Sequence, residues 1–378
     1  MTDPNPDPPV VDAVSGVVAP SDSGRSGLGI TRLPGTLGWV LRHDRRDLSL
    51  RVTPRAATVA LVLTAVLLAL MVVGIVVGGS TLATADVLRA LTGRADPATV
   101  FVVQELRMPR VATAALVGGC LGAAGLVFQR VARNPLASPD LIGFTAGAST
   151  GAVFQILVVG GTAFAVPAGA VAGGLLTGVA VYLLAWRDGL QGSRLVVVGL
   201  ALSAMLLATT SYLLSRARIT DAVAAAQWLV GSLNNRGWED AAPVAVAAVL
   251  VLPLLAALMP KLRMLELGED HARGLGVRAD LIRVLALLSG VVLTSGAVAA
   301  AGPVPFVALA APQIAARLGR GAPTTLWPSV LCGAVLTLGA DALTQQLFPG
   351  AKLPVGVVTG VLGGLYLAVL LRWQRRSR

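Results

Sequence analysis

Long apolar stretches, separated by short polar segments, recur along most of this 378-residue chain. A helix that crosses a lipid bilayer needs about 20 mostly apolar residues, and it satisfies its own backbone hydrogen bonds there. Ten stretches fit this description: 56–78, 110–128, 141–160, 163–186, 195–214, 241–259, 284–301, 303–316, 326–347 and 354–372. The pattern therefore predicts an all-α integral membrane protein with about ten transmembrane helices.

Two stretches make the number of spans less obvious. Residues 303–316 are short and contain Pro303, Pro305 and Pro312, so they are the weakest of the ten. Residues 222–233 form an eleventh apolar candidate, which is too short to cross a bilayer comfortably.

The distribution of lysine and arginine favours ten spans. With the N-terminus in the cytoplasm, 22 of the 30 positive residues fall on the cytoplasmic side and 8 on the other. Counting 222–233 as a span changes this division to 13 and 17. Because cytoplasmic loops carry the excess of Lys and Arg, we expect both termini in the cytoplasm. The same distribution explains most of the formal charge of +11 without a nucleic-acid partner.

The two ends of the chain differ from the apolar stretches. Residues 1–53 are rich in Pro, Asp, Gly, Ser and Arg without sustained periodicity, so we expect a flexible cytoplasmic tail. No short apolar stretch opens the chain, and the run before the cleavage-like Ala83-Thr84-Ala85 exceeds a signal core of about 7–15 residues. We expect a membrane domain at 54–373, a long cytoplasmic loop at about 261–283 and a basic end at 374–378.

Composition supports helices that pack closely in lipid. The chain is 55% hydrophobic and 13% charged, whereas soluble domains average about 25% charged residues; its mean hydropathy is +0.77. Glycines recur at fourfold spacing, where they allow helix backbones to approach: Gly118 and Gly122; Gly143, Gly147 and Gly151; Gly169 and Gly173; Gly356, Gly360 and Gly364. We interpret these as packing seams, with the lining of a translocation path as the alternative.

The sequence lacks an energy source and a catalytic motif. Its only lysines, Lys261 and Lys352, follow Pro260 and Ala351, so no GxxxxGK[ST] phosphate-binding loop is present. No carboxylate lies at the middle of a span, Asp341 coming closest. HExxH and GxSxG motifs are absent, and Cys120 and Cys332 lie in separate apolar runs. We expect no catalytic residue, cofactor or metal site, and a transport role powered by another subunit. An ion-coupled secondary carrier and a membrane scaffold are the alternatives.

Four segments, in order, carry a family resemblance. They are RMPRVATAALVGGCLGAAGLVFQRVARNPLASPDLIGFTAGA from Arg107, LELGEDHARGLGV from Leu265, AGPVPFVALAAPQIA from Ala301, and ADALTQQ followed by KLPVGVVTGVLGGLYLAVLL. Together they resemble the FecCD-type permeases of ABC importers for iron chelates and cobalamin. Gln313 and the ending GGLYLAVLL are most similar to the second permease of ferric-catecholate siderophore systems.

The resemblance implies a permease subunit in the cytoplasmic membrane of a bacterium that moves ferric siderophores, with cobalamin or haem as alternative cargo. It also implies three kinds of partner: two ATP-binding cassette ATPase subunits, a second permease that makes a heterodimer or a homodimer, and an extracytoplasmic siderophore-binding protein. Three positions depart from the family pattern: Pro305, Gln313 and Gln345. A heterodimer would tolerate such asymmetry.

The resemblance also assigns roles to residues. Arg107 and Arg110 correspond to docking positions for the binding protein, with interfacial anchoring as the alternative. The loop around Glu269 corresponds to the part that couples to the ATPase, with an interfacial loop that has no partner as the alternative; its candidate residues are Leu267, Gly268, Glu269, Arg273, Leu275 and Gly276. Asn134 and Pro135 form a tight cytoplasmic turn, because Pro135 restricts Asn134 to extended geometry. We expect that turn to be structural, with any gating role indirect.

Overall fold

Helices make up most of the structure, a computed structural model that describes residues 28–32, 39–43, 48–52, 54–77, 82–160, 164–187, 192–319, 326–347 and 353–376. The chain divides into two units, Met1–Pro54 and Arg55–Arg378. Residues 1–53, the expected tail, fall in the first unit, and residues 55–373 of the expected membrane domain fall in the second.

The N-terminal unit contains three short strands. β1 (Leu28–Arg32), β2 (Trp39–His43) and β3 (Leu48–Val52) form an antiparallel sheet in the order β1-β2-β3. Leu28 pairs with His43, and Trp39 pairs with Val52. The sequence pattern predicts no regular element here, because each alternation of apolar and polar residues lasts only five positions between Gly- and Pro-containing segments. Residues 1–27 of the expected tail lie outside the described residues.

The second unit is all-helical in its described residues. Its long helices are α1 (Pro54–Val77), α4 (Met108–Val131), α7 (Ala165–Ala185), α8 (Gly192–Arg216), α10 (Trp238–Glu266), α12 (Ala279–Ala301), α14 (Leu326–Leu347) and α15 (Val355–Arg376). Shorter ones are α2 (Thr84–Leu91), α3 (Pro97–Phe101), α5 (Pro139–Ile142), α6 (Phe144–Phe154), α9 (Ile219–Trp228), α11 (Glu269–Gly274) and α13 (Val307–Leu318). Two π-helical segments, η1 (Val102–Arg107) and η2 (Gln155–Gly160), precede α4 and extend α6.

The apolar helices coincide with the ten predicted stretches. Seven are long and apolar enough to cross a membrane, and three shorter ones cover Phe144–Gly160, Val307–Leu318 and Val355–Val369. The eleventh candidate forms α9, which has ten residues and is therefore about 15 Å long, half of a bilayer core. For the second unit, the structure thus confirms the prediction of an all-α membrane protein with about ten spans.

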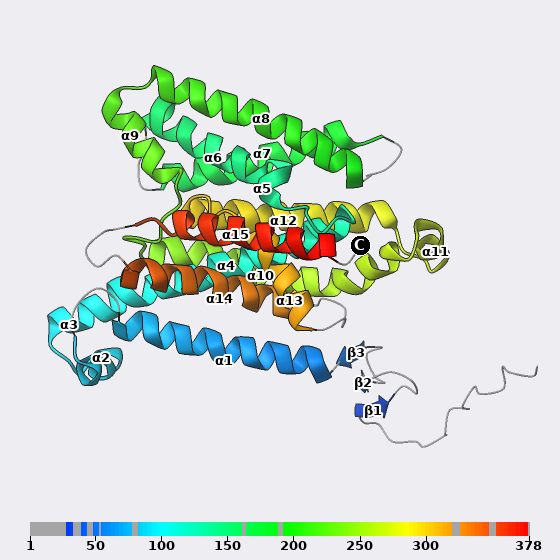
Figure 1. Ribbon diagram of the computed structural model, residues 1–378, viewed down its shortest axis with the longest axis horizontal. Coiled ribbons are helices and arrows are strands. Elements are labelled where there is room, and N and C mark those ends of the chain that lie inside the picture. The colour runs from blue at the N-terminus through cyan, green and yellow to red at the C-terminus, as the bar shows by residue number, and fades with distance from the viewer. Residues whose placement is uncertain are drawn as a thin grey trace, which may run out of the picture. The chain divides into compact units, whose positions relative to one another are not determined.

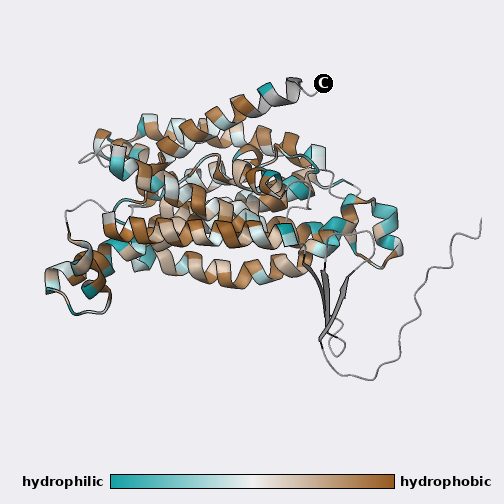
Figure 2. Cartoon of the chain, turned by 60° about the horizontal axis from the view of Figure 1, so that its bottom comes forward, coloured by the Kyte–Doolittle hydropathy of each residue, from teal (hydrophilic) through white to brown (hydrophobic). Residues whose placement is uncertain are grey.

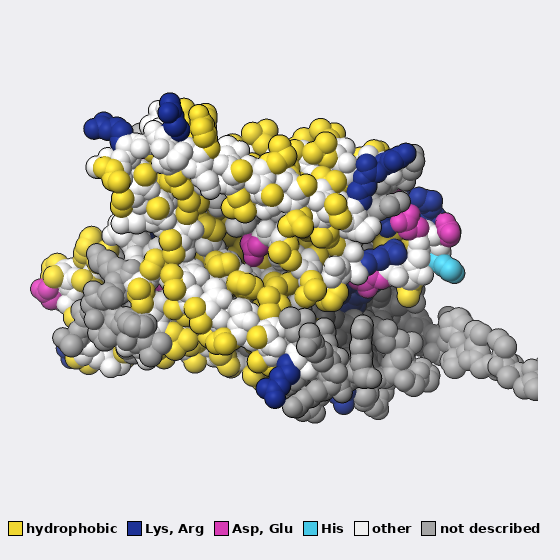
Figure 3. Space-filling view, turned by 45° about the horizontal axis from the view of Figure 1, so that its top comes forward, with side chains coloured by type: hydrophobic (Ala, Val, Ile, Leu, Met, Phe, Trp, Pro, Cys, Tyr) yellow, Lys and Arg dark blue, Asp and Glu magenta, His cyan; other side chains and the backbone are white. Residues whose placement is uncertain are grey.

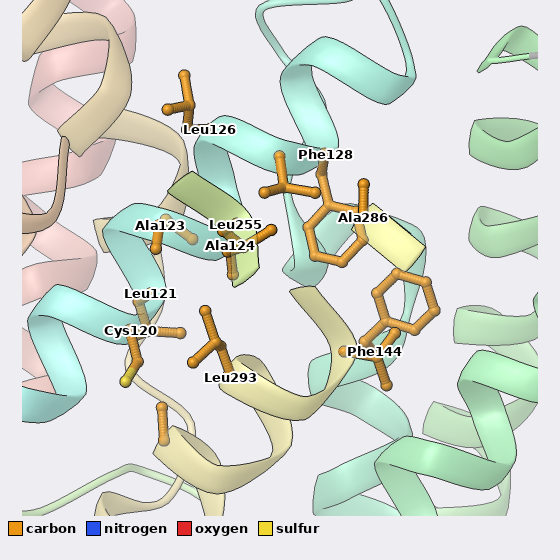
Figure 4. Close-up of a cluster of buried hydrophobic side chains, with 14 of the residues drawn as sticks. Cys120, Leu121, Ala123, Ala124, Leu126, Phe128, Phe144, Leu255, Ala286 and Leu293 are labelled. Carbon is orange, nitrogen blue, oxygen red and sulfur yellow. The ribbon is translucent and has the colours of Figure 1, made fainter. Parts of the chain in front are cut away.

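The core of the bundle surrounds α4 and α12. α4 packs against α10, α12, α13 and α14, while α12 also contacts α7 and α6. Phe128 of α4 lies 5.0 Å from Phe144 of α6 between ring centroids, and Ala286, Leu255 and Leu293 fill the space beside them (Figure 4). Hydrophobic residues recur along the outer helices (Figure 2), and large apolar side chains such as Leu61 of α1 and Leu200 of α8 are exposed, as expected where lipid or another membrane subunit replaces water.

Several of the predicted glycine seams bring backbones together. A Cβ on Gly118 would lie 2.3 Å from the carbonyl oxygen of Gly333, and one on Gly151 would lie 2.2 Å from that of Gly169. These glycines therefore act as packing seams, as expected. The last seam is tight only at its first glycine: a Cβ on Gly356 would lie 1.9 Å from the carbonyl oxygen of Val230, whereas one on Gly364 would meet nothing within 4 Å.

The weakest predicted span begins late. Gly302 has φ +72° and Phe306 has φ +67°, so the chain is not helical between α12 and the start of α13 at Val307. Non-helical backbone at membrane depth needs partners inside the protein, and Ser232 N–H donates to the carbonyl of Ala301 at 2.7 Å. The Phe306 N–H donates to the Asp140 carboxylate at 3.3 Å. Internal hydrogen bonds thus stabilise the interruption.

The short elements mark two ends of the bundle. α2, α3 and α9 lie at one end, which we term the α9 end, and α11 lies at the opposite end, the α11 end (Figure 1). The candidate docking residues precede or begin α4 at the α9 end, and the candidate coupling residues surround α11.

Candidate functional site

The loop at the α11 end contains a short helix between two glycine turns. α10 ends at Glu266, α11 covers Glu269–Gly274, and α12 begins at Ala279. Gly268 has φ +127° and Gly276 has φ +77°, a region that side-chain-bearing residues rarely adopt. The two glycines therefore let the chain turn sharply on both sides of α11.

Glu269 connects α11 to the long helix α12. Its carboxylate accepts a hydrogen bond from the guanidinium of Arg283, whose side chain is only 8% exposed, and also lies 3.5 Å from Arg273. The hydrogen bond from Arg283 is the main reason that the pKa of Glu269 lies below its ordinary value of 4.5. The carboxylate is therefore ionised at neutral pH and fixes α11 to the start of α12.

Two leucines on either side of α11 are exposed. Leu267 is 79% exposed and Leu275 is 70% exposed, whereas Ala272 between them is buried against the bundle. α11 thus rests on its alanine and presents two large apolar side chains outward, beside the charges of Glu269 and Arg273. Such an apolar pair rimmed by charge is typical of a protein interface. All six candidate coupling residues, from Leu267 to Gly276, lie in this one segment.

The Asn134–Pro135 turn lies at the same end and is tied to two neighbours. The Asn134 side chain accepts from the Leu136 N–H at 2.9 Å, and the Pro135 carbonyl accepts from Gln313 Nε2 at 2.7 Å. The preceding Arg133 donates to the carbonyl of Leu265 at the end of α10. These bonds make the turn a fixed connection between α4, α10 and α13.

At the α9 end, Arg107 points into the protein. It is 6% exposed, and its Nη1 donates to the carbonyls of Ile75 at 2.7 Å and Val76 at 3.0 Å. Both carbonyls belong to the last turn of α1, where the helix has no backbone donors of its own. Arg107 therefore caps α1, and it is not part of an open surface.

Arg110 forms a bidentate ion pair with Asp341 of α14. Its Nη2 lies 2.7 Å from Oδ1, and its Nε donates to Oδ2 at 3.0 Å. Gln345 Nε2 also donates to Oδ2 at 2.8 Å, and the Asp341 side chain is only 2% exposed. Arg110 keeps 22% of its side chain exposed, so it is the more accessible of the two predicted docking arginines.

Two structurally important residues were not among the sequence candidates. Arg283 is one, because nothing in its position predicts a partner fourteen residues earlier. Asp341 is the other. A carboxylate within a span needs a partner, so its position indicates that a partner exists, but the sequence does not say which residue it is.

The comparisons with known proteins place the chain in a family. A profile of the FecCD transport family matches residues 66–373. The ferric enterobactin transport system permease protein FepG of Escherichia coli (strain K12) is 44% identical over 301 residues, covering 80% of this chain and 91% of the relative. The achromobactin transport system permease protein CbrC of Dickeya dadantii (strain 3937) is 37% identical over 342 residues, covering 90% and 97%.

A solved structure has a similar fold. It is described as an inward-facing conformation of a metal-chelate type ABC transporter, and it is 28% identical with a TM-score of 0.74, covering 84% of this chain and 99% of that one. The family match spans most of the membrane domain, and the four sequence segments that carry the resemblance lie within it. The chain therefore belongs to the FecCD transport family.

Proposed function

We propose that this chain is a permease subunit of an ATP-driven importer that moves intact ferric siderophores across the cytoplasmic membrane of a bacterium. The relatives FepG and CbrC are named as permeases for ferric enterobactin and achromobactin. The chain has the helices of a membrane conduit and no phosphate-binding loop of its own. One observation supports the proposal most strongly: α11 is bound to α12 through Glu269 and Arg283, and Leu267 and Leu275 on either side of it are exposed at one end of the bundle.

We assign the coupling role to the segment Leu267–Gly276. Leu267 and Leu275 would enter an apolar groove on a separate ATPase subunit, and Arg273 would contact its rim. Because Glu269 binds Arg283, a displacement of α11 would be passed to α12. That helix packs against α4, α6, α7 and α10, so its movement would reach the centre of the bundle. The glycines Gly268 and Gly276 would supply the turns that let α11 stand out.

The α9 end would receive the siderophore-binding protein. Arg110 is a candidate for direct contact, because 22% of its side chain is exposed beside Asp341. Arg107 would act indirectly, because its bonds to the Ile75 and Val76 carbonyls fix the end of α1 against η1. Carboxylates on the docking protein are the groups that arginine binds best.

The Asn134–Pro135 turn would transmit movement between helices and would not contact cargo. Gln313 donates to the Pro135 carbonyl, and its Oε1 accepts from the Tyr366 hydroxyl of α15 at 3.4 Å. The turn, α13 and α15 are thereby joined at the α11 end. A change in α15 during transport would break or reform this connection.

The remaining partners follow from the same scheme. Two ATPase subunits would bind the α11 ends of two permeases, with both termini in the cytoplasm as the positive charges predict. The second permease would be a different homologous chain, since Gln313 and Gln345 replace residues common in the family. The large exposed apolar side chains of α8 and α15, among them Leu200, Met205, Val361 and Leu365, provide surface for such a partner.

Reconstitution of the complete complex tests the proposal. Proteoliposomes would hold the two permeases and the ATPase, with ATP inside the compartment that the α11 end faces and loaded binding protein on the other side. We expect accumulation of ⁵⁵Fe-labelled siderophore only with hydrolysable ATP. If this chain alone takes up siderophore and an ionophore abolishes that uptake, the chain is instead an ion-coupled carrier. If only cobalamin or haem accumulates, the assignment of ferric siderophores as cargo is wrong.

A further inference from the structure

Arg133 occupies a backbone position at which glycine is the usual residue. α4 ends at Val131, and Arg133 has φ +50°. Its N–H donates to the carbonyl of Arg130 at 3.2 Å, and the N–H of Asn134 donates to that of Gln129 at 3.0 Å. These two bonds form a Schellman motif, in which the left-handed residue is usually glycine because a Cβ is disfavoured there. The arginine at this position is therefore under backbone strain.

The arginine side chain makes a contact that glycine could not make. Its Nη2 donates to the carbonyl of Leu265 in the last turn of α10. The last carbonyls of a helix have no N–H partner in a following turn, and the helix dipole favours a cation beside them. Arg130 Nη1, one turn earlier, lies 3.4 Å from Glu266 Oε1. Two arginines at the end of α4 thus bind the end of α10.

The coupling segment Leu267–Gly276 begins two residues after the carbonyl that Arg133 binds. Figure 3 shows positive and negative side chains together at this α11 end of the bundle. The hydrogen bond from Arg283 is the main cause of the low pKa of Glu269. The positive charges of Arg273 and Arg133 lower that pKa further. Arg133 therefore lies near enough to attract α11 as well as to bind the end of α10.

We infer that Arg133 is a positioning residue for coupling: it holds the end of α10 against α4, so that a displacement of Leu267–Gly276 moves α4 as well as α12. This rests on the proposed function, which supplies an ATPase at the α11 end. Because α4 packs against α13 and α14 as well as α10 and α12, this second connection leads to the centre of the bundle. Glycine would relieve the backbone at this position, but it would also remove the guanidinium that makes the connection.

The variant Arg133→Gly separates these two properties of the residue. In proteoliposomes with the complete complex, we expect siderophore uptake per ATP hydrolysed to fall about five- to tenfold, as for loss of one charge-assisted hydrogen bond at a partly exposed site. The melting temperature of the complex should stay unchanged or rise, because the strain is relieved. Arg133→Asn should lose as much coupling, since asparagine adopts the left-handed backbone but is too short to reach α10.

A second left-handed residue supplies the matched control. Asn235 has φ +59° and lies just before the opposite end of α10, which begins at Trp238. Asn235→Gly makes the same kind of backbone change away from the coupling segment. We expect this variant to keep wild-type uptake per ATP hydrolysed.

Three results would overturn the inference. One is wild-type uptake per ATP in either variant of Arg133. Another is a parallel loss of uptake, ATP hydrolysis and melting temperature, which would show that Arg133 only stabilises the fold. The third is an Asn235→Gly variant as uncoupled as Arg133→Gly, which would assign the effect to the added glycine. The proposed function fails separately, if the wild-type complex shows no ATP-dependent uptake of siderophore.

Discussion

The bond between Glu269 and Arg283 is the most informative place to perturb this protein. If α11 contacts the ATPase as proposed and this bond connects it to α12, removal of the bond should uncouple ATP hydrolysis from transport while leaving the helix bundle assembled. We consider Arg283→Gln, Glu269→Gln and the double variant together, because each single change also affects neighbours of the altered side chain. The double variant removes both partners of this bond, and the exposed Arg273 then loses the Glu269 carboxylate as well.

The structure gives the size of the expected effect. A hydrogen bond between charged groups contributes about 1.5–3 kcal/mol, and the Arg283 side chain is almost fully buried. The Glu269 side chain is 37% exposed, so water replaces part of what is lost. We therefore expect loss of the bond to reduce the free energy that holds α11 against α12 by about 1.5–2 kcal/mol. This corresponds to a roughly 10- to 30-fold shift in the equilibrium between docked and released α11. The exposed Arg273–Glu269 pair, at 3.5 Å, should contribute less than about 0.5 kcal/mol.

Two measurements on the reconstituted complex test this estimate of the bond. Uptake of labelled siderophore per ATP hydrolysed should fall by about that factor in Arg283→Gln, and hydrogen exchange of the α11 amides should accelerate correspondingly. A double-mutant cycle should give a coupling energy of at least about 1 kcal/mol between the two residues. Two results would refute the reasoning, because α11 would then act without Arg283. One is that the effects of the two single substitutions add up in the double variant; the other is that Arg283→Gln takes up siderophore normally although its α11 amides have lost their protection from exchange.

Three further predictions follow from other contacts. Because the Glu269 pKa lies below 4.5 in the folded protein, its stabilisation of α11 should be complete above pH 4.5 and be lost as pH falls through the lower folded value. Exchange protection of α11 should thus stay flat from about pH 6 to 8 and drop on acidification, and Glu269→Gln should remove that drop. Asp341→Asn should lower stability in detergent by about 2–4 kcal/mol because Arg110 loses its anion; thermal melts should show Arg110→Gln/Asp341→Asn less impaired than the sum of the single changes. Gly125→Ala should prevent assembly, since its Cβ would lie 1.7 Å from the Ala308 carbonyl oxygen, whereas Gly364→Ala, with nothing within 4 Å, should express and transport normally.

Hydropathy alone predicted the helices because lipid leaves few alternatives. A stretch of apolar residues in a bilayer must form a helix to satisfy its backbone, so the ten stretches and the ten apolar helices coincide. The late start of α13 was harder to predict from the sequence. Pro303 and Pro305 indicate an interruption of the helix, but Asp140, the residue that stabilises it, lies on α5. The strands β1 to β3 were missed because five-residue alternations do not stand out from a polar segment.

The candidate site was predictable where its residues are neighbours in sequence. Leu267 to Gly276 form one loop, so the resemblance carried by the continuous segment LELGEDHARGLGV was sufficient to select it as a candidate. Arg107 of η1 and Arg110 of α4 were harder, because an arginine at the start of a span looks like an interfacial anchor. Their true partners are the last carbonyls of α1 and Asp341, which is 231 residues from Arg110. Sequence spacing carries no information about such contacts.

The most direct test of the central claim, that a separate ATPase drives this chain through the loop around α11, is site-specific cross-linking at position 267. The variant Leu267→Cys introduces an exposed thiol at a side chain that is now 79% exposed, while the native Cys120 and Cys332 are buried. We predict that a short bifunctional reagent joins residue 267 to the ATPase subunit, and that a membrane-impermeant thiol reagent reaches it only from the cytoplasmic side. Labelling from the external side, or full siderophore uptake after removal of Glu269–Gly274, would contradict the account.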